Sequence, residues 1–389
     1  MNLPTVVPNP GSETVSLAHT FGECLADAMR KYPDFYFFSP DETSSNRLDA
    51  VYTVSPRAWQ QDLKPWDENM APSGRVIELL SEEALFAVMA GHVMSGGRAA
   101  FASYEAFFML IASQLDQQLK FLADSKKIKW RARQHAFNLL STSAWERQDH
   151  NGFSHQSPAL ISHLLSKPSN LANCLFPIDD VSAFAAWEFM QQTKDVVNLA
   201  SFNKNDTVRW IDINHARFQL TNGGASIFQF ASDADPELVV SAIGDIATRE
   251  TLAAIKLAKQ EVPSLRIRFV GIAALSYAAI GTTNNKLKQG DFNDYFTLDK
   301  PIIVNFHGYP ETIRAIFSHY GDPARMLFHG FMEEGSTTTP LDELARNGVS
   351  RYDLAASILE RAGHYGFQTK FQDLIIRNAE HAKLFGVDG

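Results

Sequence analysis

One polar segment of this sequence gathers side chains that could carry out acid–base chemistry. The run Arg147–Gln156 reads RQDHNGFSHQ and directly follows an apolar stretch, Phe137–Ser141, which is typical of a buried strand. Because α/β proteins place ligands at the carboxyl ends of parallel strands, this run is a candidate binding or catalytic loop. A solvated surface loop accounts for the same composition. His150 and His155 are five residues apart, a spacing that does not indicate a shared metal site on a helix.

Three further segments place polar side chains where a ligand could bind, and each has an alternative structural role. Asp41–Arg47 follows the apolar run Phe35–Ser39 and could equally cap a following helix. Glu82 lies in the first turn of a predicted helix, where carboxylates commonly interact with the helix dipole. Gly335–Pro340 could form a phosphate-binding nest, although a helix cap at its end explains its composition. The sequence contains no dinucleotide-binding glycine motif, Walker loop, HExxH or GxSxG motif.

The elements that would position these residues alternate between strands and helices. In the first part of the chain we predict strands at 35–39, 75–80, 137–141 and 196–200, and helices at 81–94 and 104–122. In the second part we predict strands at 237–242, 266–271 and 301–306, and helices at 249–260 and after Thr339. A mixed stretch at 205–235, containing Gly223 and Gly224, separates the parts. The alternation predicts an α/β fold with two doubly wound, mainly parallel-sheet domains.

Composition and charge restrict the class of protein. The 389 residues are 45% hydrophobic and 20% charged, and the 28 phenylalanines predict a core rich in aromatic packing. A net charge of −9 argues against a nucleic-acid partner. No apolar run reaches the ~20 residues of a membrane helix, so we expect no membrane partner. Two cysteines and a polar, proline-containing amino terminus without an export signal favour a cytoplasmic protein.

Several motifs together resemble the phosphoketolase family in order and approximate spacing. The most specific are Ser39–Leu48 (SPDETSSNRL), Arg147–Gln156 and Glu334–Pro340 (EGSTTTP). Shorter matching pieces are Ser81-Glu82, Ser103-Tyr104-Glu105 and Asn203-Lys204. The resemblance covers nearly the whole chain from about Leu17 onward. It implies thiamine-diphosphate chemistry in which a ketose phosphate is split by inorganic phosphate.

The resemblance covers the middle and carboxy-terminal domains of this family and not its first domain. We therefore expect a flexible lead-in at 1–11, a pyrimidine-binding domain at 12–210, a linker at 211–229 and a transketolase C-terminal-like domain at 230–389. The missing domain binds the cofactor's diphosphate and Mg²⁺ in related enzymes, through a Gly-Asp-Gly motif. Gly-Asp occurs here at Gly244, Gly290 and Gly321, never followed by Gly. The resemblance thus implies half of a site, with no metal ligands in this chain.

The resemblance also implies roles for residues around the cofactor. Glu82 matches the acid that hydrogen-bonds the aminopyrimidine ring and so promotes deprotonation of the thiazolium carbon. Tyr104 and Phe107 match residues near the cofactor and substrate. Asp41 lies in a matching motif and belongs to the expected cofactor-binding set, while Glu42 receives no assigned role.

Further positions match groups around the substrate. Three match catalytic polar groups, for which the near-neutral pKa of histidine is suitable: Gln148, His150 and His155. Four match groups around the substrate phosphate: Ser45, Asn151, Lys204 and Lys126. At Lys126 the family carries an arginine, and lysine is not its equivalent in clamping phosphate. Ser143–Glu146 also departs from the family pattern beside the pocket, which affects the expected choice of substrate.

These implications favour a phosphoketolase half-enzyme, a carbon–carbon lyase that is inactive as an isolated chain. The expected products are acetyl phosphate and an aldose phosphate, from xylulose 5-phosphate or fructose 6-phosphate. The expected partners are a second copy of this chain, a separate chain carrying the diphosphate-binding domain, or both. Two alternatives remain open: a subunit of a two-component, transketolase-like two-carbon transferase, and a non-catalytic fragment or scaffold.

Overall fold

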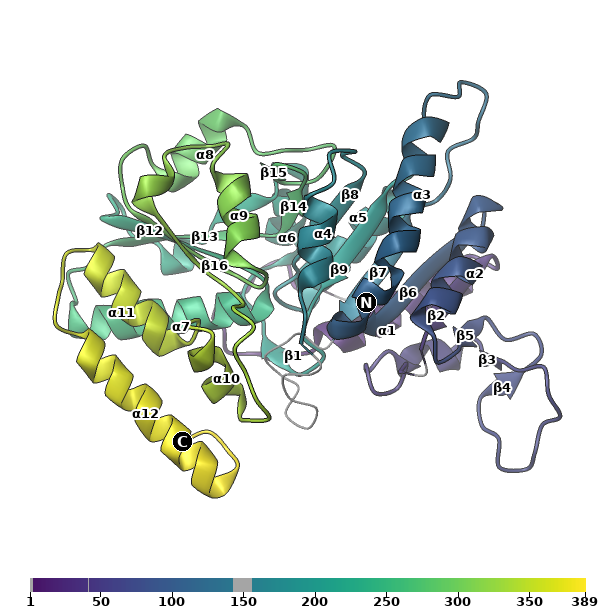
Figure 1. The fold of residues 1–389 in the computed structure, drawn as a ribbon, viewed down its shortest axis with the longest axis horizontal. Helices are drawn as coiled ribbons and strands as arrows, with labels where there is room; N and C mark the ends of the chain where they lie inside the picture. Colours follow the sequence, from purple (N-terminus) through teal and green to yellow (C-terminus); the bar gives the residue numbers. More distant parts are fainter. Residues whose placement is uncertain (1–2, 41, 143–155) are drawn as a thin grey trace. The chain divides into compact units, whose positions relative to one another are not determined.

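The chain folds into two compact units, each of which is described separately (Figure 1). The structure is a computed structural model that describes residues 3–40, 42–142 and 156–389. The first unit comprises residues 1–144 and 167–217, and the second comprises residues 145–166 and 218–389.

The first unit is built on a parallel sheet whose strands are out of sequence order. Its strands follow the spatial order β8-β9-β7-β6-β2-β5-β3-β4, and each neighbouring pair is parallel. Their bounds are β2 (Phe35–Ser39), β3 (Arg57–Ala58), β4 (Met70–Ala71), β5 (Val76–Glu78), β6 (Arg98–Tyr104), β7 (Phe137–Thr142), β8 (Ala172–Leu175) and β9 (Val197–Ser201). A separate two-stranded ladder joins β1 (Thr14–Val15) to β10 (Thr207–Val208) in antiparallel register.

Helices cover both faces of this sheet, as in a doubly wound fold. Helix α1 (Leu17–Lys31) contacts α5 (Asp180–Gln192), and α2 (Glu82–Met94) contacts α3 (Ala112–Ser125). Figure 1 shows α2 and α3 on one side of the strands and α1 on the other. Short 3₁₀ helices occupy Asp49–Thr53 and Glu105–Ile111. Helix α6 (Ile213–Thr221) spans the division between the units.

The second unit contains its own sheet, in the order β11-β13-β12-β16-β17, with β11 antiparallel and the others parallel. The bounds are β11 (Ala225–Ile227), β12 (Leu238–Ile243), β13 (Ile267–Ile272), β16 (Ile302–Phe306) and β17 (Met326–His329). A hairpin joins β14 (Ala274–Ser276) to β15 (Ala279–Ile280), and short 3₁₀ helices occupy Gln229–Ala231 and Pro323–Arg325.

Helices flank this second sheet as well. Helix α7 (Asp245–Glu261) packs on α11 (Arg351–Arg361), which in turn contacts α12 (Gln368–Phe385), and α8 and α9 lie on the opposite side of the strands in Figure 1. The remaining helices of this unit are α4 (Ala159–Leu165), α8 (Gln289–Phe296), α9 (Pro310–Phe317) and α10 (Pro340–Arg346). The predicted α/β fold with two mainly parallel-sheet domains is therefore confirmed.

One predicted helix was wrong at its start. The region 104–122 does not begin as an α-helix, because Tyr104 is the last residue of β6 and a 3₁₀ helix precedes α3. Strand β6 has the sequence RAAFASY, and its alanines favour a helix in isolation. Burial between β2 and β7 outweighs that preference.

The expected linker carries regular structure, and the end of the expected lead-in is tied to the first unit by a backbone hydrogen bond. The backbone N–H of Gly11 donates to the Arg209 carbonyl at 2.7 Å, next to the β1–β10 ladder. The expected linker at 211–229 contains α6 and β11, and the second unit also includes α4, which the sequence placed with the first domain. The core follows the prediction of aromatic packing, since its largest fully buried side chains are phenylalanines, such as Phe86 against Phe137 with ring centroids 5.8 Å apart.

Candidate active site

Polar residues of the first unit converge at one edge of its sheet. Strands β2, β6, β7 and β9 are parallel neighbours, so their carboxyl ends share an edge. The segments that leave these ends contain Glu42–Arg47, Ser103-Tyr104, Thr142 and Asn203-Lys204. This edge is where doubly wound folds bind ligands.

Glu82 is a buried carboxylate beside this edge. Ser81 is the N-cap of α2 and accepts a hydrogen bond from the Ala84 N–H at 3.3 Å, which fixes Glu82 as the first helical residue. Only 8% of Glu82 is exposed, and Ser103 Oγ donates to its Oε1 at 3.1 Å. The other carboxylate oxygen can therefore accept a hydrogen bond from a further donor. Glu82 thus does more than interact with the dipole of α2, which was the alternative role that its position suggested.

Tyr104 connects two of the residues that were expected around a phosphate. Its hydroxyl donates to Ser45 Oγ at 3.3 Å and accepts from Lys204 Nζ at 3.2 Å. The same ammonium lies 4.7 Å from the centre of the Tyr104 ring. Phe107 stacks on Tyr104 with ring centroids 6.2 Å apart and an interplanar angle of 18°. Hydroxyl donors and one cation in this arrangement suit an anionic group.

Glu42 is a second carboxyl group in this region. Burial raises its pKa from 4.5 to about 7, and the negative charge of Glu82 adds to the effect. Its backbone N–H donates to Ser39 Oγ at 3.3 Å, while its Oε2 is buried and hydrogen-bonds to no residue in the described ranges. A group that titrates near neutrality next to Glu82 can hold or release a proton at physiological pH.

A buried layer of hydrogen bonds fixes the loops that carry these groups. Thr142 Oγ1 donates to Asn46 Oδ1 at 2.7 Å and to the Ser103 carbonyl at 3.1 Å. Ser201 Oγ donates to Glu105 Oε1 at 3.1 Å. At the surface, an ion pair between Arg47 and Asp206 at 2.5 Å joins the loops after β2 and β9.

The structure brings together only some of the expected site residues. Glu82, Tyr104, Phe107, Ser45 and Lys204 belong to the group above. Another five lie outside the described residues: Asp41, Gln148, His150, Asn151 and His155.

Lys126 lies at the other edge of the same sheet. It follows α3, which runs back along the sheet from the end of β6 toward the start of β7. Its pKa is lowered by burial first, and the charges acting on it are Asp195 and Arg133, which precede β9 and β7. The structure therefore does not bring Lys126 to the Tyr104 group within this unit.

Helix α2 presents an uncovered apolar face next to Glu82. Leu85, Phe86, Met89 and Val93 are buried on one side, but Val88 and Met94 are each 56% exposed. Leu80, just before the helix, is 83% exposed. A helix that is apolar on all sides is expected to be buried on all sides.

Four contributors were not assigned a role from the sequence: Glu42, Asn46, Ser103 and Thr142. The sequence feature that could have identified them is their position, because each lies at or just after the carboxyl end of a central strand. Within the ranges 3–40, 42–142 and 156–389, no group of three or more His, Cys, Asp or Glu side chains could hold a metal ion. In the same ranges, no helix is both long and apolar enough to cross a membrane.

Comparisons with known proteins identify related sequences. The family described as "D-xylulose 5-phosphate/D-fructose 6-phosphate phosphoketolase" matches residues 19–192, and its "XFP C-terminal domain" matches residues 204–385. "Probable phosphoketolase 2" of Nostoc sp. (strain PCC 7120) is 34% identical over 98% of this chain and 50% of its own length. "Probable phosphoketolase" of Rhodopseudomonas palustris (strain TIE-1) is 37% identical over 90% of this chain and 46% of its own. The chain thus spans about half the length of the curated relatives it matches.

Solved structures with the same fold are transketolases. Transketolase from Leishmania mexicana has a TM-score of 0.68 and 16% identity, covering 94% of this chain and 48% of that one. A "Split gene transketolase, inactive beta4 tetramer" has a TM-score of 0.61 and 13% identity, covering 90% of this chain and 99% of that one. At these identities the likeness establishes a common fold and nothing further.

Proposed function

Because the chain belongs to the phosphoketolase family, we propose that it forms half of a thiamine-diphosphate-dependent phosphoketolase. The reaction is the phosphorolytic cleavage of xylulose 5-phosphate or fructose 6-phosphate to acetyl phosphate and an aldose phosphate. The observation that carries this proposal is the buried Glu82, with one oxygen bound by Ser103, beside the Ser45–Tyr104–Lys204 cluster.

The residues at this edge fit the pyrimidine half of thiamine diphosphate. The carboxyl groups of buried Glu82 and partly buried Glu42 lie close enough for the charge of Glu82 to raise the pKa of Glu42. Glu42 Oε2 is buried and has no partner among the described residues, which suits an edge that a polar group completes. When bound, the cofactor supplies a nucleophilic carbon for attack on the ketose carbonyl. Glu82 would hold a proton at the pyrimidine ring nitrogen, and Phe107 would pack against the ring system.

The Ser45–Tyr104–Lys204 cluster would bind the phosphate of the substrate. Lys204 provides a cation, and the hydroxyls of Ser45 and Tyr104 provide donors that the existing contacts hold in place. From the family resemblance, Asn151 belongs to the same role, and Gln148, His150 and His155 to proton transfer at the substrate hydroxyls. Asp41 stays in the proposed cofactor-binding set.

A partner chain carrying the diphosphate-binding half would complete the site and hold Mg²⁺. Two observations support this partner: the chain spans half of its relatives, and α2 leaves the apolar side chains Val88 and Met94 uncovered. A partner packed on Val88 and Leu80 would cover the apolar surface that the first unit leaves exposed beside the helix start. The split-gene transketolase that matches over nearly its whole length is described as inactive in its β4 form. We propose that this chain is likewise inactive alone.

Reconstitution tests the proposal. The purified chain is titrated with thiamine diphosphate and Mg²⁺, alone and with a chain carrying the diphosphate-binding domain. We expect heat of binding and acetyl phosphate formation only in the mixture. Tight stoichiometric binding by the chain alone would contradict the half-site. Two-carbon transfer to an aldose phosphate, without acetyl phosphate, would assign the chain to a two-component transferase instead.

A further inference from the structure

Two loops of the first unit each expose a tryptophan at the surface. One loop joins β3 to β4, and the other joins α3 to β7. Trp66 in the first loop is 77% exposed, and Trp130 in the second is 88% exposed. Each loop also exposes an aliphatic side chain, Leu63 at 52% and Ile128 at 41%. Because tryptophan is enriched where proteins bind each other, each loop is a candidate contact surface.

The loop between β3 and β4 is acidic and ordered. Residues 60–69, here called the acidic loop, contain three carboxylates and one lysine. Asp62 and Glu68 are exposed and form no ion pair with any residue in the described ranges. The Lys64 N–H donates to Asp67 Oδ2 at 2.7 Å, and the Asp67 N–H donates to the Lys64 carbonyl at 3.0 Å. This turn fixes the part of the loop that carries the tryptophan.

The loop after α3 carries the opposite charge. Residues 126–133, here called the basic loop, contain five cations and no carboxylate. Lys129 forms no ion pair with any residue that the structure describes. Lys127 pairs with Asp124 at 2.8 Å, but the two side chains are 76% and 79% exposed. Because such surface pairs contribute little, both lysines are available to a partner.

The basic loop is anchored on both sides of its last exposed residue. Arg131 Nη1 and Arg133 Nε each donate to Asp195 at 2.9 Å, and Asp195 is 2% exposed. This anchor directly follows Trp130 in the sequence. Both loops therefore present their tryptophans from fixed backbones, which lowers the entropic cost of association.

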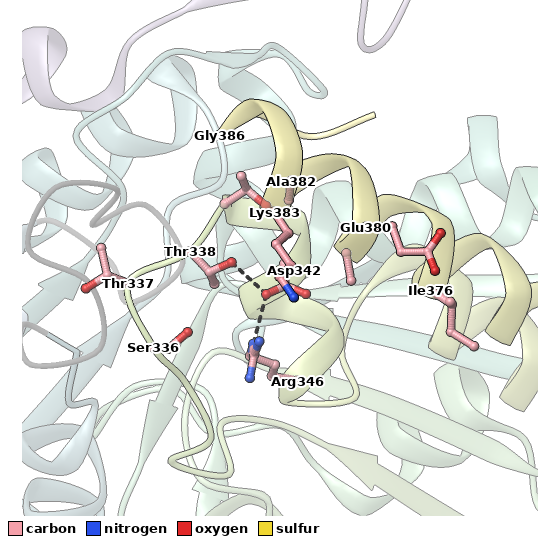
Figure 2. Close-up of a pocket in the computed structure, with 12 residues that line it drawn as sticks. Ser336, Thr337, Thr338, Asp342, Arg346, Ile376, Glu380, Ala382, Lys383 and Gly386 are labelled. Atoms are coloured by element: carbon pink, nitrogen blue, oxygen red, sulfur yellow. Dashed lines mark hydrogen bonds and ion pairs between the residues drawn. The ribbon is translucent and has the colours of Figure 1, made fainter.

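A carboxylate of the second unit provides a contrast. It belongs to Asp342, in a pocket of about 710 Å³ between the loop before α10 and helix α12 (Figure 2). Asp342 Oδ2 accepts from Arg346 Nε at 2.8 Å and from Thr338 Oγ1 at 2.6 Å. This charge is compensated by neighbours in the same chain, whereas the acidic loop leaves two carboxylates without a cation.

One copy of the chain does not bring its two loops together. Figure 1 shows the loop after α3 at the top of the first unit and the β3–β4 loop at the bottom. Four steps of the strand order separate β7 from β3, or about 19 Å at the usual spacing of neighbouring strands. The exposure of both tryptophans agrees with this separation. A partner must therefore supply the surface that covers each loop.

We propose that the acidic loop of one copy of this chain binds the basic loop of a second copy. A two-fold axis repeats the contact, so that each copy contributes both loops. Trp66 and Trp130 become covered, and the carboxylates of one loop pair with the lysines of the other. Two chains with a net charge of −9 repel each other overall, so their association requires a place where opposite charges meet. The inference does not depend on the proposed catalytic function, because neither loop belongs to the Glu82 and Tyr104 region.

Exchanging the charges of the two loops tests the proposal on the full chain. One variant carries Lys127→Glu with Lys129→Glu, and the other carries Asp62→Lys with Glu68→Lys. In sedimentation velocity we expect the parent to form dimers and each variant alone to dimerise roughly tenfold or more weakly, because like charges then meet at both contacts. An equimolar mixture of the two variants should restore the dimer, since both contacts of the mixed dimer again join opposite charges.

Controls separate this contact from general effects of charge and folding. All four substituted residues are exposed, so both variants should unfold at the temperature of the parent. Lys288→Glu with Lys383→Glu makes the same change in net charge on exposed lysines of the second unit and should leave the dimer intact. A monomeric parent, a mixture that stays monomeric, or an equal loss of dimer in this control would each overturn the inference. Assemblies of the parent larger than a dimer would overturn the two-fold arrangement.

Discussion

At the scale of single residues, the chemistry depends on what surrounds each carboxylate. Glu82 and Glu83 are neighbours in the first turn of α2, yet Glu82 is buried against Ser103 and Glu83 is exposed. Two adjacent glutamates with opposite exposure provide a matched pair for separating a catalytic effect from a helix-dipole effect.

The first prediction compares these two glutamates. Glu82→Gln should lower turnover of the reconstituted enzyme by roughly 10²-fold or more, because the amide cannot share a proton with the pyrimidine ring. Glu83→Gln loses the same negative charge near the helix start and should keep turnover within a few-fold. Rates of acetyl phosphate formation measure both. Comparable losses in the two variants would show that the helix dipole, and not proton sharing, is responsible.

The second prediction concerns the substrate phosphate. Lys204→Ala should raise KM for a ketose phosphate roughly tenfold or more, because a charge-assisted contact to a dianion is removed. An unphosphorylated ketose should be much less affected. Lys120→Ala, an exposed lysine on α3, serves as the control and should match the parent. If Lys204→Ala impairs both substrates to the same degree, the side chain acts on the fold or the reaction and not on phosphate.

At the scale of elements, the sequence predicted those parts whose signal is local. The run FYFFS and the Ser81-Glu82-Glu83 start of α2 matched the structure because burial and capping act on neighbouring residues. Strand β6 was missed because its alanines have no strand preference and its burial comes from β2 and β7, which are distant in sequence. Local patterns do not contain that information.

The same limit applies to the site. The contact of Tyr104 with Ser45 and Lys204 joins residues 59 and 100 positions apart, and only the strand order brings them together. The sequence motifs supplied these residues through family resemblance and not through spacing. Lys126 was expected with them, but α3 carries it to the other edge of the sheet.

A prediction at this scale concerns the uncovered face of α2. Val88→Glu should weaken association with the diphosphate-binding chain at least tenfold, because the carboxylate would be buried in an apolar contact. The isolated variant should stay folded, since Val88 is 56% exposed. Leu298→Glu, on a residue of the second unit that is 76% exposed, is the control. Calorimetric titration of the two chains measures the effect, and unchanged affinity for Val88→Glu would exclude this face.

At the scale of the whole molecule, each of the two units contains a glutamate that binds its proton more tightly than glutamate ordinarily does. Burial is the main cause in both cases, raising the pKa of Glu42 in the first unit and of Glu343 in the second from 4.5 to about 7. Glu343 is 2% exposed, and its Oε2 has no hydrogen-bond partner among the described residues.

The sign of the resulting pH dependence follows from proton binding. Between about pH 4.5 and 7 each folded unit binds more protons at its glutamate than the unfolded chain does. The contribution to stability is therefore fully present below pH 4.5 and is lost as the pH rises through 7. Partly buried His215 and His329, whose pKa values are lowered mainly by desolvation, contribute with the opposite sign. Comparing a variant with its parent cancels these histidine contributions.

The last prediction uses this comparison in both units. Each unit has its own core, so we expect two unfolding transitions in a calorimetric scan of the isolated chain. Between pH 5 and 8 the unfolding temperature of each transition should fall. Glu42→Gln should reduce this fall for one transition and Glu343→Gln for the other, because glutamine stays neutral throughout.

Glu360→Gln, on α11, serves as the control and should leave the fall in both unfolding temperatures unchanged. If the unfolding temperatures of both glutamine variants depend on pH as those of the parent do, these carboxyl groups ionise near pH 4.5 in the folded chain. If both variants alter the same transition, the two units unfold as one cooperative body and the division of the chain does not extend to its stability.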